Sequence, residues 1–262
     1  MLKVIRPGKK ALAQMSRSPV NNTALMLYHT PAQTQQASFY APWCQLQEVE
    51  QPPAVLTASL FLDHAGMWLL MPNQSRAYQP SDADLLRRAS AGSAGSELAK
   101  ACGGNLQGQR VLDACAGFGS DGLLLTQFGA RVTFVERERL IWVLLHERVR
   151  HLENSTAICD EASNVLTAAA HPADNWDVVL LDPMFAPSAK KALPNLGLQY
   201  LRELTEPRGA SADDLSGLVA AAQRRCRGRV VLKRRLKEPV LDRVAFQIKG
   251  KSVRFDVYLG TA

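Results

Sequence analysis

Residues 110–121 read Arg-Val-Leu-Asp-Ala-Cys-Ala-Gly-Phe-Gly-Ser-Asp, and they constrain the fold of this chain more than any other stretch. The run Arg110–Asp113 predicts a short strand that ends in a carboxylate, residues 114–119 predict a tight turn, and the leucine-rich residues 122–128 predict a helix. Such a junction places backbone N–H groups and a helix N-terminus at the carboxyl end of a strand. A nucleotide-like cofactor can approach there because Gly117 and Gly119 carry no Cβ. The stretch therefore predicts a cofactor site in an α/β fold.

The position of Asp113, four residues before Gly117, bears on which cofactor is bound. Dinucleotide folds use a glycine-rich turn to hold a pyrophosphate, whereas Asp-x-x-x-Gly-x-Gly is usual in S-adenosylmethionine (SAM) methyltransferases, where the acid faces the methionine ammonium. The pattern favours SAM, and an unrelated α/β turn is the alternative. Residues further along the chain have to decide between a SAM site and an unrelated turn.

The next two predicted strands supply further groups for a cofactor. Residues 131–135 form a strand ending at Glu136, about twenty residues beyond the turn, where doubly wound folds hold ribose hydroxyls. We expect Glu136 to bind the ribose and Arg137 to flank the adenine; the alternative is that Glu136 only caps the helix 139–152. A third strand, 156–159, precedes Ala162 and Ser163, which we expect near the adenine edge.

Trp-Asp-Val-Val-Leu-Leu-Asp-Pro-Met-Phe, residues 176–185, is the most specific stretch in the chain. An apolar strand ends at Asp182, Pro183 prevents a helix from continuing, and Phe185 follows. Amino-group methyltransferases use [Asp/Asn]-Pro-Pro-[Tyr/Phe] because a conjugated exocyclic amine is a poor nucleophile that has to be held by an acceptor and stacked on an aromatic ring. We expect Asp182, or the Pro183 carbonyl, to accept from the amine and Phe185 to stack on the base. The alternative is a strand that ends in a proline turn.

Positive charge is concentrated near the end of the chain. The formal charge is +7, yet residues 224–256 hold twelve Lys or Arg against three Asp or Glu, so the rest sums to about −2. Such a segment favours nucleic-acid phosphates, with a solvated charged surface as the alternative. The residues expected to contact RNA are Arg87, Arg88, Lys190, Lys191, Lys233 and Arg234.

The remaining sequence predicts the overall organisation. Residues 1–42 lack periodicity and predict an irregular lead-in, residues 43–71 predict a small antiparallel sheet, and 244–249 with 253–259 predict a final hairpin. We expect a small β-rich subdomain in residues 1–79 and a methyltransferase domain in residues 80–262. We expect that domain to be an α/β, Rossmann-like class I SAM methyltransferase with a seven-stranded, mostly parallel sheet and an antiparallel last strand. Five unpaired cysteines, no apolar run of membrane length and no signal peptide favour a reduced cytoplasmic protein without a metal.

Residues 112–121, 135–137, 181–185, 231–234 and 254–258 together resemble, in order and spacing, the RsmJ family of bacterial 16S rRNA (guanine-N2) methyltransferases. The resemblance covers about residues 80–262, with weaker similarity over the preceding sheet. It implies methyl transfer from SAM to the exocyclic amine of one guanine, with 16S rRNA or the small ribosomal subunit as partner. The sequence departs from the family pattern at Ser120, usually Arg, at Cys115, often Thr, and at Arg235, where Pro is expected. The family's SAM contacts match Ser120, Asp121, Glu136, Arg137, Ala162, Ser163 and Asp182.

Two other functions remain open at this point. One is amino-methylation of DNA or of a protein glutamine, which uses a similar Asn-Pro-Pro-Tyr motif. The other is an RNA-binding protein on a decayed methyltransferase fold, which the presence of Asp113, Glu136 and Asp182 disfavours. An active enzyme of this kind would work by direct in-line displacement.

Overall fold

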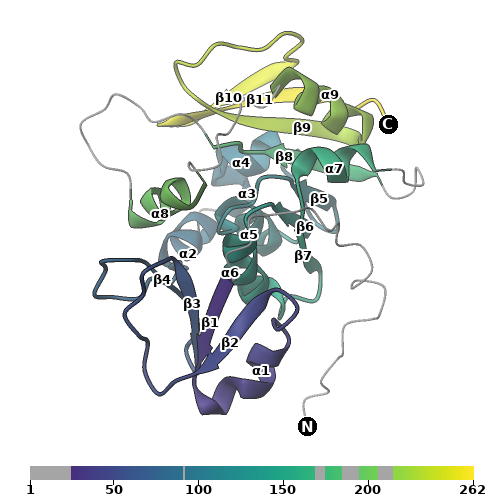
Figure 1. The fold of residues 1–262 in the computed structure, drawn as a ribbon. Coiled ribbons are helices and arrows are strands. Elements are labelled where there is room, and N and C mark those ends of the chain that lie inside the picture. The colour runs from purple at the N-terminus through teal and green to yellow at the C-terminus, as the bar shows by residue number, and fades with distance from the viewer. Residues whose placement is uncertain (1–24, 91, 169–174, 185–194, 206–214) are drawn as a thin grey trace.

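The computed structural model describes residues 25–90, 92–168, 175–184, 195–205 and 215–262, which contain a seven-stranded and a four-stranded sheet (Figure 1). Phe185, Lys190 and Lys191, three of the predicted site residues, lie outside the described residues. In the described part of the chain, no helix is both long enough and apolar enough to cross a membrane.

The seven-stranded sheet has the order β10-β11-β9-β8-β5-β6-β7. Four neighbouring pairs, from β9 to β7, are parallel, and β11 runs antiparallel to both β9 and β10. This confirms the predicted mostly parallel sheet with an antiparallel last strand. Its strands are β5 (Arg110–Asp113), β6 (Arg131–Glu136), β7 (Ser155–Cys159), β8 (Trp176–Leu181), β9 (Cys226–Arg235), β10 (Phe246–Lys249) and β11 (Val253–Leu259).

Helices cover both faces of this sheet because successive strand residues point to opposite sides. Val111 and Val178 pack in one apolar cluster with α4 and α5, whereas Leu112 and Val179 pack in another with α7 and α9. The helices are α2 (Ala83–Ser90), α3 (Gly92–Gly95), α4 (Glu97–Ala101), α5 (Ser120–Gln127), α6 (Arg139–Val149), α7 (Ala162–Thr167), α8 (Leu196–Thr205) and α9 (Leu215–Arg224). Ser96 caps α4, as its sequence predicts, and accepts a hydrogen bond from the Ala99 amide at 3.2 Å.

The N-terminal sheet differs from the expected antiparallel one. Its order is β2-β1-β3-β4, and β1 runs parallel to both β2 and β3, so that only β3 and β4 form an antiparallel hairpin. The expectation of an irregular lead-in is therefore wrong for residues 25–38, which supply an inner strand and a short helix. The elements are β1 (Leu25–His29), a 3-10 turn (Pro31–Gln33), α1 (Thr34–Ser38), β2 (Cys44–Glu48), β3 (Ser59–Asp63) and β4 (Gly66–Leu70).

Helix α6 joins the two sheets. Its residues 141–144 pack against the small sheet in one cluster with Leu27 and Leu60, while Leu145 and Val149 belong to the core of the large sheet. In Figure 1 this helix lies between the small sheet below and the large sheet above. The small sheet therefore has no separate core of its own, because α6 supplies one wall of it.

Candidate active site

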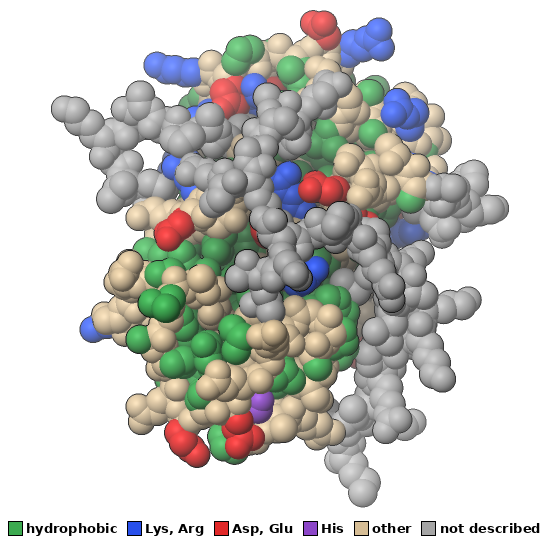
Figure 2. All heavy atoms as spheres, viewed as in Figure 1, with side chains coloured by type: hydrophobic (Ala, Val, Ile, Leu, Met, Phe, Trp, Pro, Cys, Tyr) green, Lys and Arg blue, Asp and Glu red, His purple; other side chains and the backbone are tan. Residues whose placement is uncertain are grey.

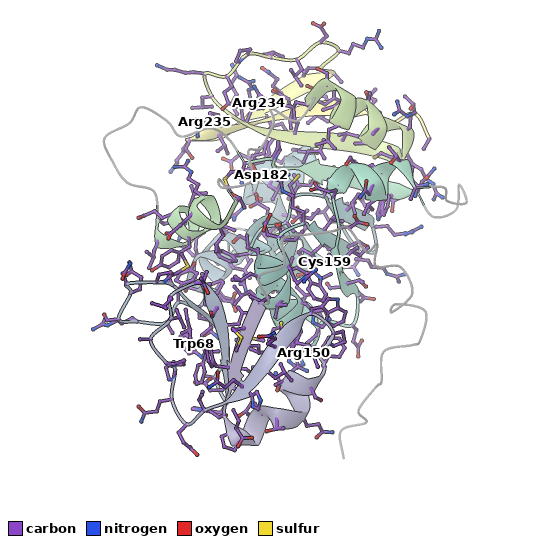
Figure 3. The ribbon with its side chains drawn as sticks, viewed as in Figure 1. Trp68, Arg150, Cys159, Asp182, Arg234 and Arg235 are labelled. Carbon is purple, nitrogen blue, oxygen red and sulfur yellow. The ribbon has the colours of Figure 1, made fainter. Side chains whose placement is uncertain are left out.

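The acids Asp113, Glu136 and Asp182 lie at the carboxyl ends of β5, β6 and β8. These strands are neighbours in the order β8-β5-β6 and run parallel, so their carboxyl ends meet at one edge of the sheet. Asp113 and Glu136 are buried and Asp182 is half-buried. The three predicted acids therefore lie at one edge of the sheet. Figure 3 shows Asp182 near the middle of the molecule, below Arg234 and Arg235.

The glycine turn between β5 and α5 holds two of these acids with backbone amides. The Gly117 N–H donates to Oε2 of Glu136 at 2.9 Å, and the Gly122 N–H donates to Oδ2 of Asp113 at 3.1 Å. Gly119 precedes α5 with a φ of 81°, a left-handed conformation that favours glycine.

Gly122 completes a Gly-x-Gly-x-x-Gly spacing with Gly117 and Gly119, whereas the pattern described from the sequence contains only the first two glycines. A Cβ at Gly122 would lie 2.3 Å from Cε1 of Phe134 and 2.6 Å from Oδ2 of Asp113. The third glycine thus lets α5 pack closely on the sheet and on the acid. The missed signal was its spacing, three residues after Gly119.

Glu136 is held by a second amide, the Glu138 N–H, which donates to Oε1 at 2.8 Å. Burial raises the pKa of Glu136 to about 7, and the two amide hydrogen bonds oppose that rise. Glu138, not Glu136, occupies the N-cap position of α6. The proposal that Glu136 accepts from ribose hydroxyls stays open, and its preorganisation by two amides supports it.

Asp121, in the first turn of α5, connects this edge to two cations. Arg88 of α2 donates to Oδ1 of Asp121 at 2.6 Å, and Lys233 of β9 donates to Oδ2 at 2.6 Å. The same Lys233 Nζ lies 2.7 Å from Oδ2 of Asp182. One ammonium therefore bridges two carboxylates that lie far apart in sequence.

These contacts move the pKa values of the acids in opposite directions. Burial and the nearby Asp121 and Asp182 raise the pKa of Asp113 to about 8. Burial also acts to raise the pKa of Asp121, but Lys233 and Arg88 outweigh it and hold that pKa below its usual value. For Asp182, burial and the Asp121 charge together outweigh Lys233, and its pKa is raised.

The residues predicted near the adenine follow the carboxyl ends of β6 and β7. Arg137 pairs with Glu161 at 3.6 Å, and Ala162 and Ser163 begin α7, just after β7. Because β7 is the parallel neighbour of β6, these residues lie at the same edge as the acids.

The cations expected to contact RNA differ in their exposure and in their ion-pair partners. Arg87 is exposed and pairs with Asp84 on its own helix. Arg88 and Lys233 instead face Asp121, as described above. Arg234 is buried and contacts Glu238 at 3.0 Å and the Pro239 carbonyl at 3.2 Å. Lys233 and Arg234 thus have carboxylate partners within the protein, and their contact with RNA stays a prediction. A run of basic residues does not tell which side chains point inward, so the sequence did not predict these ion pairs.

No cluster of three or more metal-ligating side chains is found in the described ranges. A separate hollow lies at the opposite, amino-terminal edge of the sheet, beside Gly108, Asp177 and Gly228. That hollow is remote from the carboxyl ends of the strands, and we do not assign the cofactor to it. Figure 2 shows basic and acidic side chains close together near the middle of the face it presents, above a more apolar lower half.

Comparisons with known proteins agree with this geometry. A family model described as "Putative SAM-dependent methyltransferase" matches residues 78–260. "Ribosomal RNA small subunit methyltransferase J" of Alkalilimnicola ehrlichii is 34% identical over 253 residues, covering 88% of this chain and 94% of that protein. The chain belongs to the methyltransferase J family. The alignment with the Alkalilimnicola ehrlichii protein covers more of the chain than residues 80–262, where the resemblance described from the sequence is strongest.

Two further comparisons support the assignment to the methyltransferase J family and its fold. The protein of the same name from Magnetococcus marinus is 37% identical over 179 residues, covering 63% of this chain and 67% of that protein. The crystal structure of a SAM-dependent methyltransferase from Neisseria gonorrhoeae shares the fold, with a TM-score of 0.67, 24% identity and coverage of 90% of this chain and 97% of that one. The match of residues 78–260 to the SAM-dependent methyltransferase family model gives SAM as the cofactor.

The residues at the site fit SAM, which carries a sulfonium and an ammonium. Four acids, Asp113, Asp121, Asp182 and Glu136, lie at this edge together with three cations, Lys233, Arg88 and Arg137, so carboxylates outnumber cations there and suit a cationic ligand. The glycine turn packs closely on the core, since a Cβ at Gly119 would lie 2.5 Å from Cδ1 of Leu145.

Proposed function

We propose that the protein transfers a methyl group from SAM to the exocyclic N2 of a guanine in 16S ribosomal RNA. The observation that carries the proposal is the position of Asp182-Pro183 at the same sheet edge as Asp113 and Glu136, within a chain of the methyltransferase J family. The relatives named for small-subunit ribosomal RNA support the substrate, either as naked RNA or as the assembled subunit. Such a substrate would place the protein in the bacterial cytoplasm.

We assign the cofactor to the turn and the acids around it. Asp113 would face the methionine ammonium, Glu136 would accept from the ribose hydroxyls, and Arg137 with the start of α7 would flank the adenine. Ser120 and Asp121 lie at the N-terminus of α5, where cofactor contacts are expected. SAM supplies an electrophilic methyl group on sulfur when it is bound.

Asp182 and Pro183 act on the guanine. A carboxylate or carbonyl acceptor holds an N–H of the amine and orients its lone pair toward the methyl group, so that the reaction can proceed in line. The proton that the amine loses after transfer passes to solvent or to an acceptor at this edge. Phe185 is the proposed stacking surface, and Met184 takes the place of the second proline in the motif.

Two rival functions predict different results. Methylation of DNA or of a protein glutamine would share the acceptor geometry but not the RNA substrate. A decayed RNA-binding fold would fail to bind SAM, and isothermal titration at high protein concentration measures that directly.

The deciding experiment is transfer of labelled methyl from SAM to naked 16S RNA and to 30S subunits, followed by mass mapping of the modified base. We expect N2-methylguanine at one position. If DNA or protein becomes labelled while RNA does not, the protein instead methylates DNA or a protein glutamine.

Asp182→Ala should lower the transfer rate by about 10²- to 10³-fold, because the amine loses its positioned acceptor, while SAM binding becomes weaker but stays measurable. Asp242→Ala removes an exposed acid from the loop after β9 and is the matched control. Full activity of the Asp182→Ala enzyme would remove the acceptor role.

A further inference from the structure

Lys233 is a basic residue with an unexpected place in the structure. It lies on β9, and its Nζ is 2.6 Å from Oδ2 of Asp121 and 2.7 Å from Oδ2 of Asp182. Only 22% of its side-chain surface is exposed. Arg234 and Arg235, the next two residues, contact Glu238 and not these acids. One lysine of a basic run is thus built into the acidic edge of the sheet.

The pair of contacts uses one oxygen of the Asp182 carboxylate. Since Lys233 holds Oδ2, the other oxygen, Oδ1, remains outside this ion pair and is available to accept from a substrate N–H. A carboxylate that is fixed through one oxygen has a defined plane, which is the property that an acceptor for an amine needs.

The surroundings of Lys233 also indicate that its positive charge offsets the repulsion between two carboxylates. Two carboxylates in direct contact with it would repel each other without a cation between them, and each would then gain a proton more readily. The titratable or charged groups that face this cluster from the described elements are Arg88 of α2, Cys102 after α4, Asp113 of β5, Cys115 of the turn, Asp121 of α5 and Asp182 after β8.

We propose that Lys233 is a positioning residue for methyl transfer, which favours the ionised forms of Asp121 and Asp182 side by side and turns Oδ1 of Asp182 toward the amine. The inference rests on the proposed function for the identity of the amine. It differs from a phosphate-binding role, because a lysine between two carboxylates has its donors directed inward. The rise in the Lys233 pKa, which the two acids produce against the effect of burial, agrees with this assignment.

The first test is the pH profile of transfer by Lys233→Met. Without the ammonium, the pKa values of Asp182 and Asp121 rise, so the acid limb of kcat/KM should move to higher pH by about one unit or more. At the optimum pH we expect kcat to fall by about ten- to a hundredfold, while KM for RNA changes by less than about twofold. Lys233→Arg should restore the acid limb, and Lys100→Gln, at an exposed site on α4, is the control.

Asp121→Asn tests the same arrangement of Lys233 and its two acids, and it should shift the acid limb in the opposite direction. It removes the negative charge that raises the Asp182 pKa, so the acid limb should move to lower pH even though SAM binds less tightly. This variant also keeps the inference open to refutation if Lys233→Met does not fold.

SAM affinity as a function of pH separates the two proposals. If the wild-type protein methylates no RNA, the proposed function fails, but the midpoint at which SAM binding weakens in acid should still rise in Lys233→Met. A KM for RNA that rises while kcat and the acid limb stay unchanged would assign Lys233 to phosphate. Unchanged pH profiles of both transfer and SAM binding would overturn the positioning role.

Discussion

Asp113 and Asp121 show how two nearby carboxyl groups obtain different properties from their neighbours. Asp113 is 2% exposed and its hydrogen bond from the Gly122 amide does not offset burial, so its pKa rises to about 8. Asp121 is nearly as buried but contacts Lys233 and Arg88, and its pKa falls. Asp113 is therefore the easier of the two to protonate near neutral pH, and a cationic ligand would favour its ionised form.

Ionising the buried Asp113 carboxyl lowers the stability of the folded protein. Asp113→Asn should therefore make the protein without SAM more stable, by an amount that grows with pH. The pKa of Asp113 is higher in the folded than in the unfolded chain, so its contribution to stability is fully present below about pH 4 and is lost as the pH rises through about 8. The asparagine does not ionise and its Oδ1 can still accept from Gly122. We expect the Tm difference, variant minus wild type, to grow from pH 4 to pH 8, by about 2 to 4 °C for each kcal/mol regained.

The same variant should bind SAM about 10- to 100-fold more weakly, because a charge-assisted hydrogen bond to the ammonium is lost. Thermal unfolding at several pH values and isothermal titration measure the two effects. Asp177→Asn at the opposite edge of the sheet is the matched control. A Tm difference that shrinks with rising pH would contradict the raised pKa.

At this scale the sequence identified the acids but not their partners. Asp113, Glu136 and Asp182 are predictable because each follows an apolar run, and strand ends of a parallel sheet meet. Lys233 was not predictable as their partner, since it stands in the run Lys-Arg-Arg and lies 112 residues from Asp121. Only the pairing of β8 with β9 brings it to the acids.

At the scale of elements, the junction of β5 and α5 depends on close packing. The amide of Gly122 reaches Asp113 only because α5 approaches Phe134 of β6 without an intervening side chain. Gly122→Ala should push the helix, the ring or the carboxylate aside and destabilise the fold by about 1 to 3 kcal/mol. We also expect weaker SAM binding, since Asp113 would be displaced.

Thermal unfolding and SAM titration check this variant together. Gln127→Ala, at an exposed position near the end of the same helix, should change stability by less than about 0.5 kcal/mol. A Gly122→Ala protein with wild-type stability and affinity would show that the junction relaxes freely.

Periodicity predicted most elements of the large sheet, but it failed for β1. The run Leu-Met-Leu-Tyr-His is short and is followed by Pro31, which favoured an irregular segment. Its parallel pairing with β2 and β3 comes from contacts that no local pattern reports.

At the scale of the whole molecule, a buried polar cluster ties the N-terminal part to the methyltransferase part. The Tyr40 hydroxyl donates to Oε2 of Glu147 at 2.8 Å, and Nδ1 of His146 lies 2.9 Å from the hydroxyl oxygen of Tyr40. Since the hydroxyl hydrogen goes to Glu147, the His146 Nδ1–H is the donor in the second bond. Gln36 also donates to Glu147, at 2.5 Å. Burial lowers the pKa of His146 to about 4, so the ring is neutral at pH 7.

Tyr40→Phe should therefore destabilise the whole protein by about 1 to 3 kcal/mol, because a buried carboxylate loses a donor. Thermal unfolding followed by hydrogen exchange of β1 and α6 measures both the loss and its place. Tyr28→Phe, at a half-buried tyrosine of β1, is the control. Protection lost only in β1 would show that the two parts unfold separately.

The shared wall formed by α6 has a consequence for synthesis on the ribosome. Strands β1 to β4 leave the exit tunnel before residues 139–149 exist, so their apolar faces have no partner to cover them during that interval. We expect the nascent N-terminal segment to stay unfolded, and to be a target for chaperones, until the middle of the chain has emerged.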